Sequence, residues 1–251
     1  MPIVFYSKQD VAGSNIAGIL RSRGASFEII EIDGSHTHAD WLSDKYASDL
    51  FVFASRHRSE TGSPCLTVHA PGNWGSEAQM GGNPRELALT SAKALAFAFR
   101  FLASNPLAGF TPFLEVSHHG PTALNTPCLF VEVGSSEKEW ANEKACGIVA
   151  DAIDALCKAD LSKVDGKVCL GFGGTHYCPK FKELALNDYA FSHIASKYAL
   201  DFVDEAMIKE AVRKTVEPVE TAVIDWKGCS GPQRKKLIIM LEALGLSVER
   251  A

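Results

Sequence analysis

The sequence predicts one α/β domain, spanning residues 1–251, with a mixed and largely parallel sheet and helices on both faces. Apolar runs rich in Val, Ile, Leu and Phe alternate with segments of helical periodicity from one end of the chain to the other. A length of 251 residues, 46% of them hydrophobic, suits one large α/β domain or two small ones. No internal repeat, low-complexity tract or clear linker divides the chain, which favours a single domain.

The composition narrows the class of protein. A net charge of −5 argues against non-specific nucleic-acid binding over the whole surface but allows a local basic site. The seven cysteines include no C-x-x-C pair, and we interpret them as reduced, mostly buried thiols. The N-terminus lacks the basic segment of a signal peptide, and the longest apolar helical patch, residues 94–99, is far shorter than the roughly 20 residues that span a bilayer. We therefore expect a cytoplasmic protein without a membrane partner.

The first elements follow from short apolar runs and their boundaries. Residues 2–6 and 27–32 are typical of buried strands, and residues 11–23 form a helical pattern that ends at Gly24. The polar segment that follows, residues 33–40, contains His36 and His38, and we interpret it as a surface loop.

In the middle of the chain, polar side chains repeatedly follow strand-like runs. Ligands of open α/β sheets lie at the carboxyl ends of the strands, so we expect a shared cleft there. Residues 50–54 and 66–69 are predicted strands. Two further apolar runs lead to polar tips, one before the segment 115–121 and one at the start of the segment 129–137. The polar tips of these four strands contain Arg56, His57, His69, Glu115, His118, His119 and Glu132.

The remaining elements alternate in the same way. We expect helices at residues 84–103, 136–158 and 200–215, and a last helix that begins after the N-cap Ser230 and ends at Gly245. Residues 167–170 and 221–226 are predicted strands. The region around His193 is short and irregular.

Two motifs in this part of the chain suggest binding of an anion. Gly173-Gly174-Thr175 forms a turn whose backbone N–H groups can approach an anion or a carbonyl, and it leads into His176 and Tyr177. Lys227 and Arg234 flank the start of the last helix and are candidates for binding a phosphate, although a solvated basic turn explains them equally well.

The set of histidines with Glu115 and Glu132 favours metal-assisted chemistry. The chain contains no G-x-S-x-G elbow, no P-loop motif and no H-E-x-x-H motif. Imidazole and carboxylate groups are common ligands of catalytic zinc, which makes hydroxide available near pH 7. For any single histidine, the alternative is a hydrogen-bonded structural role.

Several of these segments together resemble the archaeal-and-plant type of D-aminoacyl-tRNA deacylase, which belongs to a zinc-dependent family. The resemblance runs in order from the N-terminal strand to Lys227. Ser117, Cys178 and Ser192 depart from the pattern that is usual in the family. The matching segments are 55–59, 66–73, 115–121, 131–137 with Trp140, 173–177 and 225–227.

The resemblance implies hydrolysis of the ester between a D-amino acid and the 3′ end of tRNA, with zinc as cofactor. It also implies a fold related to peptidyl-tRNA hydrolases and nucleoside phosphorylases. As a hypothesis, zinc is held by some of His118, His119, His176 and His193. His118, His176 and Glu132 are then the catalytic residues, and Glu132 accepts a proton or orients a ligand.

The same hypothesis assigns the binding of substrate. The Gly173, Gly174 and Thr175 N–H groups hold the ester oxyanion. Arg56, Lys227 and Arg234 contact phosphates. His57 and His69 are further substrate-binding residues.

Three alternatives stay open at this point. The first is a metal-independent hydrolase that uses the histidines as general base and hydrogen-bond donors. The second is a non-catalytic module that binds tRNA or a nucleotide. The third is a nucleoside phosphorylase on the same fold. The sequence decides neither between a monomer and a homodimer nor how many metal ions bind.

Overall fold

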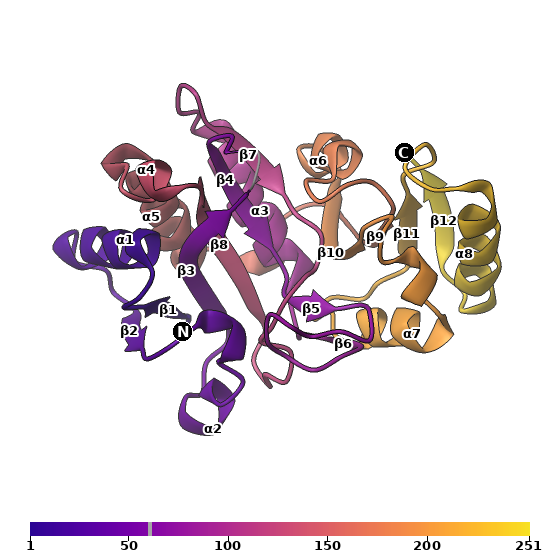
Figure 1. Ribbon diagram of the computed structural model, residues 1–251, viewed down its shortest axis with the longest axis horizontal. Coiled ribbons are helices and arrows are strands. Elements are labelled where there is room, and N and C mark those ends of the chain that lie inside the picture. The colour runs from indigo at the N-terminus through magenta and orange to yellow at the C-terminus, as the bar shows by residue number, and fades with distance from the viewer. Residues whose placement is uncertain (60–61) are drawn as a thin grey trace.

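The strands of the protein form two principal sheets that lie side by side (Figure 1). The structure is a computed structural model that describes residues 1–59 and 62–251. The first sheet has six strands in the order β2 (Glu28–Ile32), β1 (Ile3–Ser7), β3 (Phe51–Arg58), β8 (Cys128–Ser135), β4 (Cys65–His69) and β7 (Thr111–Leu114). The second has four strands in the order β10 (Tyr189–Ala195), β9 (Lys167–Phe172), β11 (Thr221–Ile224) and β12 (Ser247–Arg250). A short pair, β5 (Gly72–Asn73) and β6 (Glu86–Leu87), accompanies them.

The pairing within the sheets confirms the predicted α/β class and its mixed, largely parallel character. All neighbouring strands in the two principal sheets are parallel except β4 and β8, which run antiparallel. The strands are distributed over two sheets, whereas the sequence predicted one.

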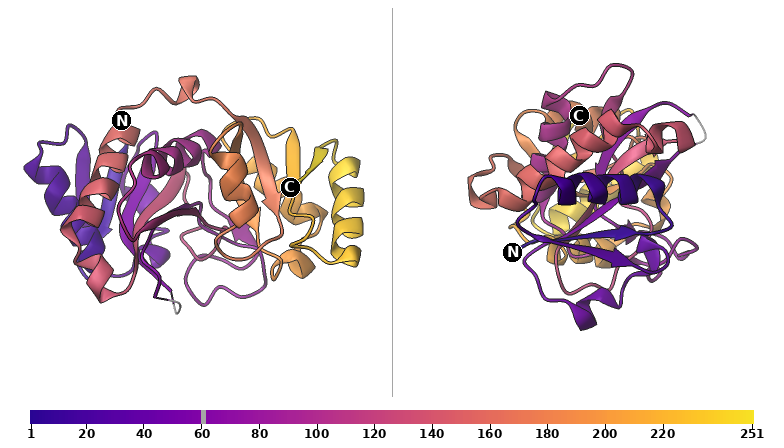
Figure 2. Two further views of the ribbon diagram at one scale, coloured as in Figure 1. Left: turned by 90° about the horizontal axis from the view of Figure 1, so that it is seen from above. Right: turned by 90° about the vertical axis from the view of Figure 1, so that its left-hand side faces the viewer.

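Helices pack on both sheets and also join them (Figure 2). Helices α1 (Val11–Ser22) and α5 (Glu143–Lys158) pack against each other beside β3 and β8. Helix α3 (Ala92–Ser104) contacts β4 and β7 of the first sheet and β10 of the second, so it bridges the two. The other helices are α2 (Leu42–Lys45), α4 (Glu137–Trp140), α6 (Pro179–Ala185), α7 (Glu205–Arg213) and α8 (Gly231–Ala243), with 3-10 turns at His36–His38, Leu161–Lys163 and Leu200–Phe202.

Alternation along the strands separates the core of the first sheet into two layers. Val52 and Ala54 of β3 join the layer beneath α1, α3 and α5, while Phe51 and Phe53 join a smaller layer on the opposite face. The smaller layer is covered largely by the short helix α2 and by loops, which leaves that face accessible near the strand ends.

Three helices differ from their predicted extents: one begins later than predicted, and two are interrupted. The helix predicted at residues 84–103 begins only at Ala92, because Ser91 accepts a hydrogen bond from the Ala94 N–H and acts as N-cap. The segment 136–158 contains two helices, since Asn142 caps α5 separately from α4. The helix predicted at residues 200–215 is likewise interrupted, with Asp204 as the N-cap of α7.

Two further predictions for local structure are wrong. The region around His193 is strand β10 rather than an irregular segment, and a register shift between Phe191 and Ile194 accounts for its irregular pattern. His36 is buried in a 3-10 turn, against Phe53 and Phe130, rather than exposed in a loop, whereas His38 is exposed as predicted.

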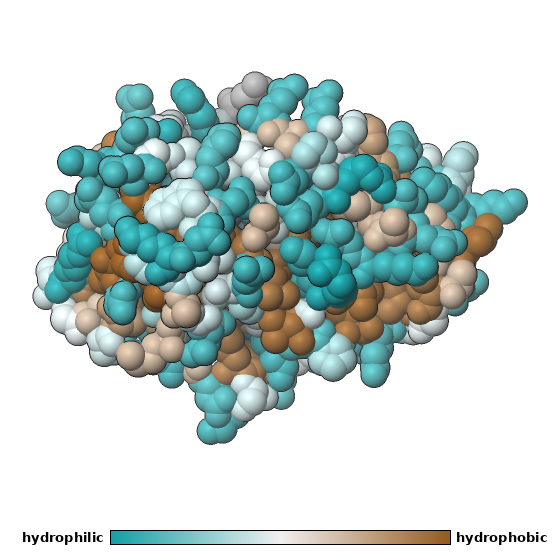
Figure 3. All heavy atoms as spheres, turned by 90° about the horizontal axis from the view of Figure 1, so that it is seen from below, coloured by the Kyte–Doolittle hydropathy of each residue, from teal (hydrophilic) through white to brown (hydrophobic). Residues whose placement is uncertain are grey.

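Within the described residues, no helix combines the length and the apolar character needed to cross a membrane. The face shown in Figure 3 is mostly hydrophilic, with hydrophobic side chains gathered in separate patches. Buried apolar side chains instead form the internal clusters on and between the sheets.

Candidate functional site

One face of the six-stranded sheet changes from apolar to polar along the strands. Because side chains two residues apart point to the same face, Phe51 and Phe53 of β3 are followed on that face by Ser55 and His57. On β8, Phe130 is followed in the same way by Glu132. The apolar part anchors the sheet, and the polar part forms the floor of the site.

The strand register places partners around Glu132. Ser55 of β3 and Thr67 of β4 are both paired with Glu132 in the sheet. The Ser55 hydroxyl donates a short hydrogen bond to Glu132 Oε1, and the Thr67 hydroxyl donates one of 3.3 Å to Oε2. Two neighbouring strands therefore fix the orientation of this buried carboxyl group.

Glu115 follows β7 and is the second buried carboxyl group of the site. Its N–H donates to Val68 O, and its Oε2 lies 2.7 Å from His176 Nε2 and 3.7 Å from His118 Nε2. Its Oε1 lies 3.1 Å from His57 Nδ1 but makes no hydrogen bond with the described residues. Three imidazoles thus surround one carboxylate.

The pKa values of these groups are shifted in opposite directions. Burial raises the pKa of Glu132, and the charge of Glu115 raises it further, against the hydrogen bonds that lower it. Burial also raises the pKa of Glu115, but the hydrogen bond with His176 and the charges of His57 and His118 outweigh it and lower the pKa below its usual range. The pKa of His57 is lowered by burial but raised overall by its hydrogen bond with Glu132 and by both carboxylates.

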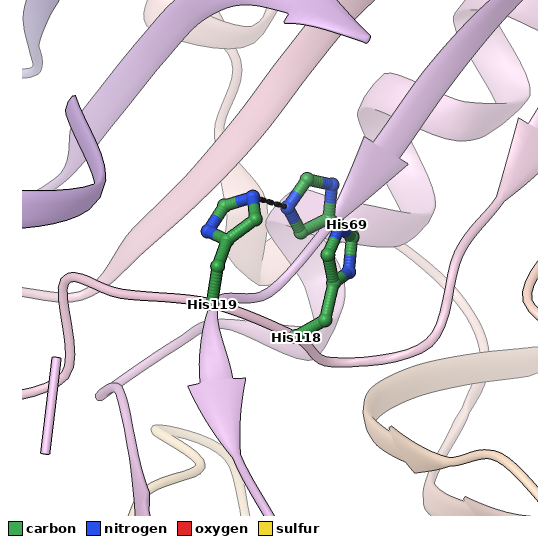
Figure 4. Close-up of side chains that lie close together, drawn as sticks. All are labelled: His69, His118 and His119. Atoms are coloured by element: carbon green, nitrogen blue, oxygen red, sulfur yellow. Dashed lines mark hydrogen bonds between the residues drawn. The ribbon is translucent and has the colours of Figure 1, made fainter. Parts of the chain in front are cut away.

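Two further imidazoles, those of His69 and His119, meet the His118 ring (Figure 4). His69 ends β4, while His118 and His119 lie in the loop after β7, which pairs with Pro71 through His118. His69 Nε2 lies 3.1 Å from His119 Nε2, and the His69 ring stacks on His118 with centroids 4.3 Å apart. His119 has a positive φ of 47°, uncommon for a residue other than glycine and most often seen at functional sites.

Hydrogen bonds to carbonyl groups fix which ring nitrogen is available. His118 Nδ1 lies 2.8 Å from Val116 O, and His119 Nδ1 lies 2.6 Å from Gly120 O. A carbonyl only accepts, so each Nδ1 carries the proton and each Nε2 carries a lone pair. Burial lowers the pKa of His118 to about 4 and that of His119 well below its usual range, so both rings are neutral at pH 7.

The donor atoms fit a metal ion. Five histidines and two glutamates form three overlapping sets whose ligand atoms lie within 4.8 Å of one another: His69, His118, His119; His57, Glu115, His176; and His69, Glu115, Glu132. We call these seven residues the His–Glu cluster.

Neutral imidazole with a free lone pair is the form that binds zinc. His69 Nδ1 is buried and makes no hydrogen bond with the described residues, but lies 3.9 Å from Glu132 Oε2. It can therefore carry the proton toward the carboxylate and leave Nε2 for a metal.

A pocket of about 440 Å³ opens onto the cluster. Its lining residues include His118, His119, His176 and Glu132 of the cluster, together with Arg56 and His36. The Arg56 guanidinium stacks over Trp140 at 5.1 Å, and its backbone N–H donates to Asp10 at 2.9 Å. The pocket therefore combines a cationic side chain with the neutral imidazoles.

Not every residue predicted for the site lies in this cluster. His193 is fully buried in β10, where Nδ1 lies 3.1 Å from the Ser117 hydroxyl, and none of the three ligand sets among the described residues includes it. Lys227 and Arg234 lie beyond β11, at the second sheet, and do not line the pocket.

In the turn that precedes His176, the backbone N–H groups that were predicted to bind the oxyanion have other partners. Gly173 and Gly174 have φ values of 105° and 77°, which only glycine adopts readily. Their N–H groups donate to Ala195 O at 2.8 Å and to Gly228 O at 3.4 Å. Neither group is free to bind an oxyanion in this conformation. The turn instead positions His176, while Thr175 is exposed.

Glu115 was expected as an acid of a metal-assisted site, and the structure adds its contacts with three histidines. Several residues for which the sequence gave no site role also contact the cluster. Ser55 and Thr67 hold Glu132, and the Tyr177 hydroxyl lies 2.9 Å from His57 Nε2. Side chains two residues apart on a strand share a face, so the sequence could have predicted that Ser55 lies on the face of His57 and Thr67 on the face of His69. The position of His36 carried no such signal.

A family model and the curated relatives of this chain identify the same family. A family model for D-aminoacyl-tRNA deacylase matches residues 44–249. The D-aminoacyl-tRNA deacylase of Methanocaldococcus jannaschii is 36% identical over 259 residues, covering 99% of this chain and 98% of the relative. That of Methanosarcina acetivorans is 38% identical over 244 residues, covering 94% and 80%. A crystal structure of a conserved protein of unknown function matches with a TM-score of 0.91 and 30% identity, covering 100% of this chain and 95% of the other.

Proposed function

Because the chain belongs to the D-aminoacyl-tRNA deacylase family, we propose that it is an enzyme that hydrolyses D-aminoacyl-tRNA at the His–Glu cluster. The products are the free D-amino acid and tRNA, so the reaction serves quality control in translation. Such an enzyme acts where aminoacyl-tRNA is used, and we place it in the cytoplasm. The observation that supports the site most strongly is the cluster of five histidines and two glutamates, of which four histidines and Glu132 line one pocket.

We assign the metal ion to His69, His118 and His119. Two of these rings have their Nε2 lone pairs fixed by carbonyl acceptors, and the third faces Glu132 through Nδ1. Zinc, when bound by such a set, lowers the pKa of a water molecule and polarises a carbonyl group. His176 and His193, which the sequence suggested as ligands, are not needed for this set.

Glu132 is the proton acceptor in this account. Its raised pKa brings it closer to neutral pH, which makes it a stronger base than an ordinary carboxylate. The Ser55 and Thr67 hydroxyl groups hold it in place. Glu115 has the opposite role: it remains ionised and orients His57 and His176.

Arg56 and His57 are the binding groups of the pocket that fit the end of a nucleic acid. The Arg56 side chain is exposed and lines the pocket, so it can contact a phosphate or the ribose. Both hands of an amino acid offer the same chemical groups. Discrimination of the D form therefore depends on the shape of the pocket around the ester.

The test compares D-tyrosyl-tRNA and L-tyrosyl-tRNA as substrates of the purified protein, with and without a chelator. We expect hydrolysis of the D form only, lost with chelator and restored by zinc. D-specific hydrolysis that is indifferent to chelator would leave the function but remove the metal, and the imidazoles would then act as bases and hydrogen-bond donors. Hydrolysis of neither substrate would contradict the proposal.

A further inference from the structure

Cationic and aromatic side chains gather at the carboxyl edge of the four-stranded sheet. We call this surface the basic edge and define it by Lys197, Tyr198, Trp226, Lys227, Arg234 and Arg250. The four strands of this sheet are all parallel, so residues that follow or end β10, β11 and β12 lie at the same edge. This edge is at the top of Figure 1, where the chain ends.

Aromatic rings contact three of the four cations of the basic edge. The guanidinium carbons of Arg250 and Arg234 lie 3.9 Å and 4.8 Å from the centroid of the Trp226 ring. Lys197 Nζ lies 4.9 Å from the centroid of Tyr198, whose side chain is 70% exposed. Cation–π contacts of this kind position a charge without neutralising it.

The cations of the basic edge lack acidic partners. Lys197, Lys227, Arg234 and Arg250 form no salt bridge with any residue in the described ranges. By contrast, Lys167, at the start of β9, pairs with Glu249 at 2.6 Å.

Two acids near the basic edge accept hydrogen bonds from neutral groups rather than from its cations. Asp225 accepts from the Gly228 N–H, and Asp201 accepts from Gln233. The chain as a whole has a net charge of −5, so a group of four cations without salt-bridge partners among the described residues is a local feature of this edge.

Backbone contacts connect the basic edge to the His–Glu cluster. The Lys197 N–H donates to Gly174 O at 2.9 Å, and the Gly174 N–H donates to Gly228 O beside Lys227. Gly174 is two residues from His176, a separation of at most about 7 Å along the chain. His176 O in turn accepts from the Val116 N–H, next to the histidines of the loop after β7. The basic edge therefore adjoins the site where the ester is cleaved.

From this arrangement we infer that the basic edge binds the sugar–phosphate backbone and unpaired bases of the tRNA acceptor end. The inference rests on the proposed function, since the ester must enter the pocket while the preceding nucleotides cross an adjacent surface. Single-stranded nucleic acids are bound by grooves that combine cations with aromatic rings on which bases stack. The exposed Tyr198 ring and the unpaired cations supply both elements.

The test uses two substrates that share one ester. D-tyrosyl-tRNA carries the whole acceptor arm, whereas D-tyrosyl-adenosine carries the terminal nucleoside without the preceding phosphates. The full-length variants Lys197→Glu and Arg250→Glu reverse a charge on the basic edge. Lys209→Glu is the matched control, because Lys209 is exposed on α7, on the opposite side of the molecule in Figure 1. Circular dichroism verifies that each variant is folded.

We expect KM for D-tyrosyl-tRNA to rise about tenfold or more in both edge variants, with kcat unchanged. The kinetic constants for D-tyrosyl-adenosine should stay within about twofold. The dependence of tRNA binding on salt should weaken by about 0.7 in the slope of log K against log salt for each phosphate that the variant no longer neutralises. An unchanged KM for D-tyrosyl-tRNA, or an equal loss on both substrates, would overturn the inference.

Binding of uncharged tRNA separates this inference from the proposed function, because it needs no catalysis. If the wild-type protein hydrolyses D-tyrosyl-tRNA but the edge variants bind uncharged tRNA as tightly as wild type, the inference fails and the function stands. If the wild-type protein hydrolyses neither ester but binds uncharged tRNA more tightly than the edge variants do, the function fails and the inference stands.

Discussion

Glu115 and Glu132 are two buried carboxyl groups of the same pocket whose pKa values are shifted in opposite directions. Burial and the charge of Glu115 raise the pKa of Glu132, whereas the hydrogen bond with His176 and the charges of His57 and His118 lower the pKa of Glu115 despite its burial. When the pKa values of two neighbouring carboxyl groups are shifted apart, one group commonly accepts a proton and the other stays ionised. The sequence predicted a role for Glu132, but the role of Glu115 depends on contacts with His57 and His176, which come from other strands and loops.

At the residue scale, Gly134 is predicted to be essential for the position of His57. A Cβ atom at Gly134 would lie 2.7 Å from Cys65 Sγ and 2.8 Å from His57 Cδ2, so Gly134→Ala should displace His57 from Glu115 and Tyr177. We expect kcat/KM for D-tyrosyl-tRNA to fall at least about tenfold.

The control for this substitution is Gly18→Ala. No heavy atom lies within 4 Å of a Cβ at Gly18, which is in the middle of α1. That variant should keep full activity and gain about 0.5–1 kcal/mol in free energy of unfolding. Wild-type activity in Gly134→Ala would contradict the prediction that the close packing of Gly134 against Cys65 and His57 holds His57 in place.

At the scale of the elements, sequence patterns predicted most strands and helices but failed at boundaries set by distant residues. The start of α3 is an example. Its first N–H groups are bound by Glu217, whose carboxylate accepts from Ala92 at 2.9 Å and Lys93 at 3.2 Å. Glu217 is more than 120 residues away along the chain, so no local pattern could indicate that the helix begins after Ser91 rather than at residue 84.

This contact gives a prediction for stability. Glu217→Ala should reduce the free energy of unfolding by about 1–2 kcal/mol, because two helix N–H groups and the Ser91 hydroxyl lose their acceptor. Urea denaturation measures the change. Glu220→Ala, at an exposed position, should stay within about 0.5 kcal/mol of wild type. Equal stability of the two variants would show that Glu217 does not cap α3.

At the scale of the whole molecule, the α/β class and the parallel pairing were predictable, but the division into two sheets was not. The inner strands of both sheets, such as β3, β8, β9 and β11, are locally the same kind of apolar run. Helix α3 packs on strands of both sheets and is itself apolar on nearly all sides, so its sequence does not show where one sheet ends and the other begins. The same reasoning applies to the site, because the residue types were visible in the sequence while their grouping required the register of β3, β8 and β4.

Buried neutral histidines predict a loss of stability in acid. Burial lowers the pKa of His36, His118 and His193 to about 4, below the unfolded value of 6.5. Between these pH values the unfolded chain binds more protons than the folded protein, so the free energy of unfolding decreases as the pH falls from 6.5 to 4. Each histidine contributes a slope of up to about 1.4 kcal/mol per pH unit. Urea denaturation at several pH values measures this change. A free energy of unfolding that stays constant between pH 6.5 and 4 would contradict the burial of these histidines in the neutral form.

The central claim is that the His–Glu cluster carries the hydrolysis of D-aminoacyl-tRNA. The most direct measurement is the single-turnover rate on D-tyrosyl-tRNA of His118→Ala, beside the control His38→Ala, whose side chain is exposed outside the cluster. We predict a fall of at least about 100-fold for His118→Ala, the lower range for loss of a catalytic group, with a folded protein, and a rate within about twofold of wild type for His38→Ala. A wild-type rate in folded His118→Ala would contradict the claim.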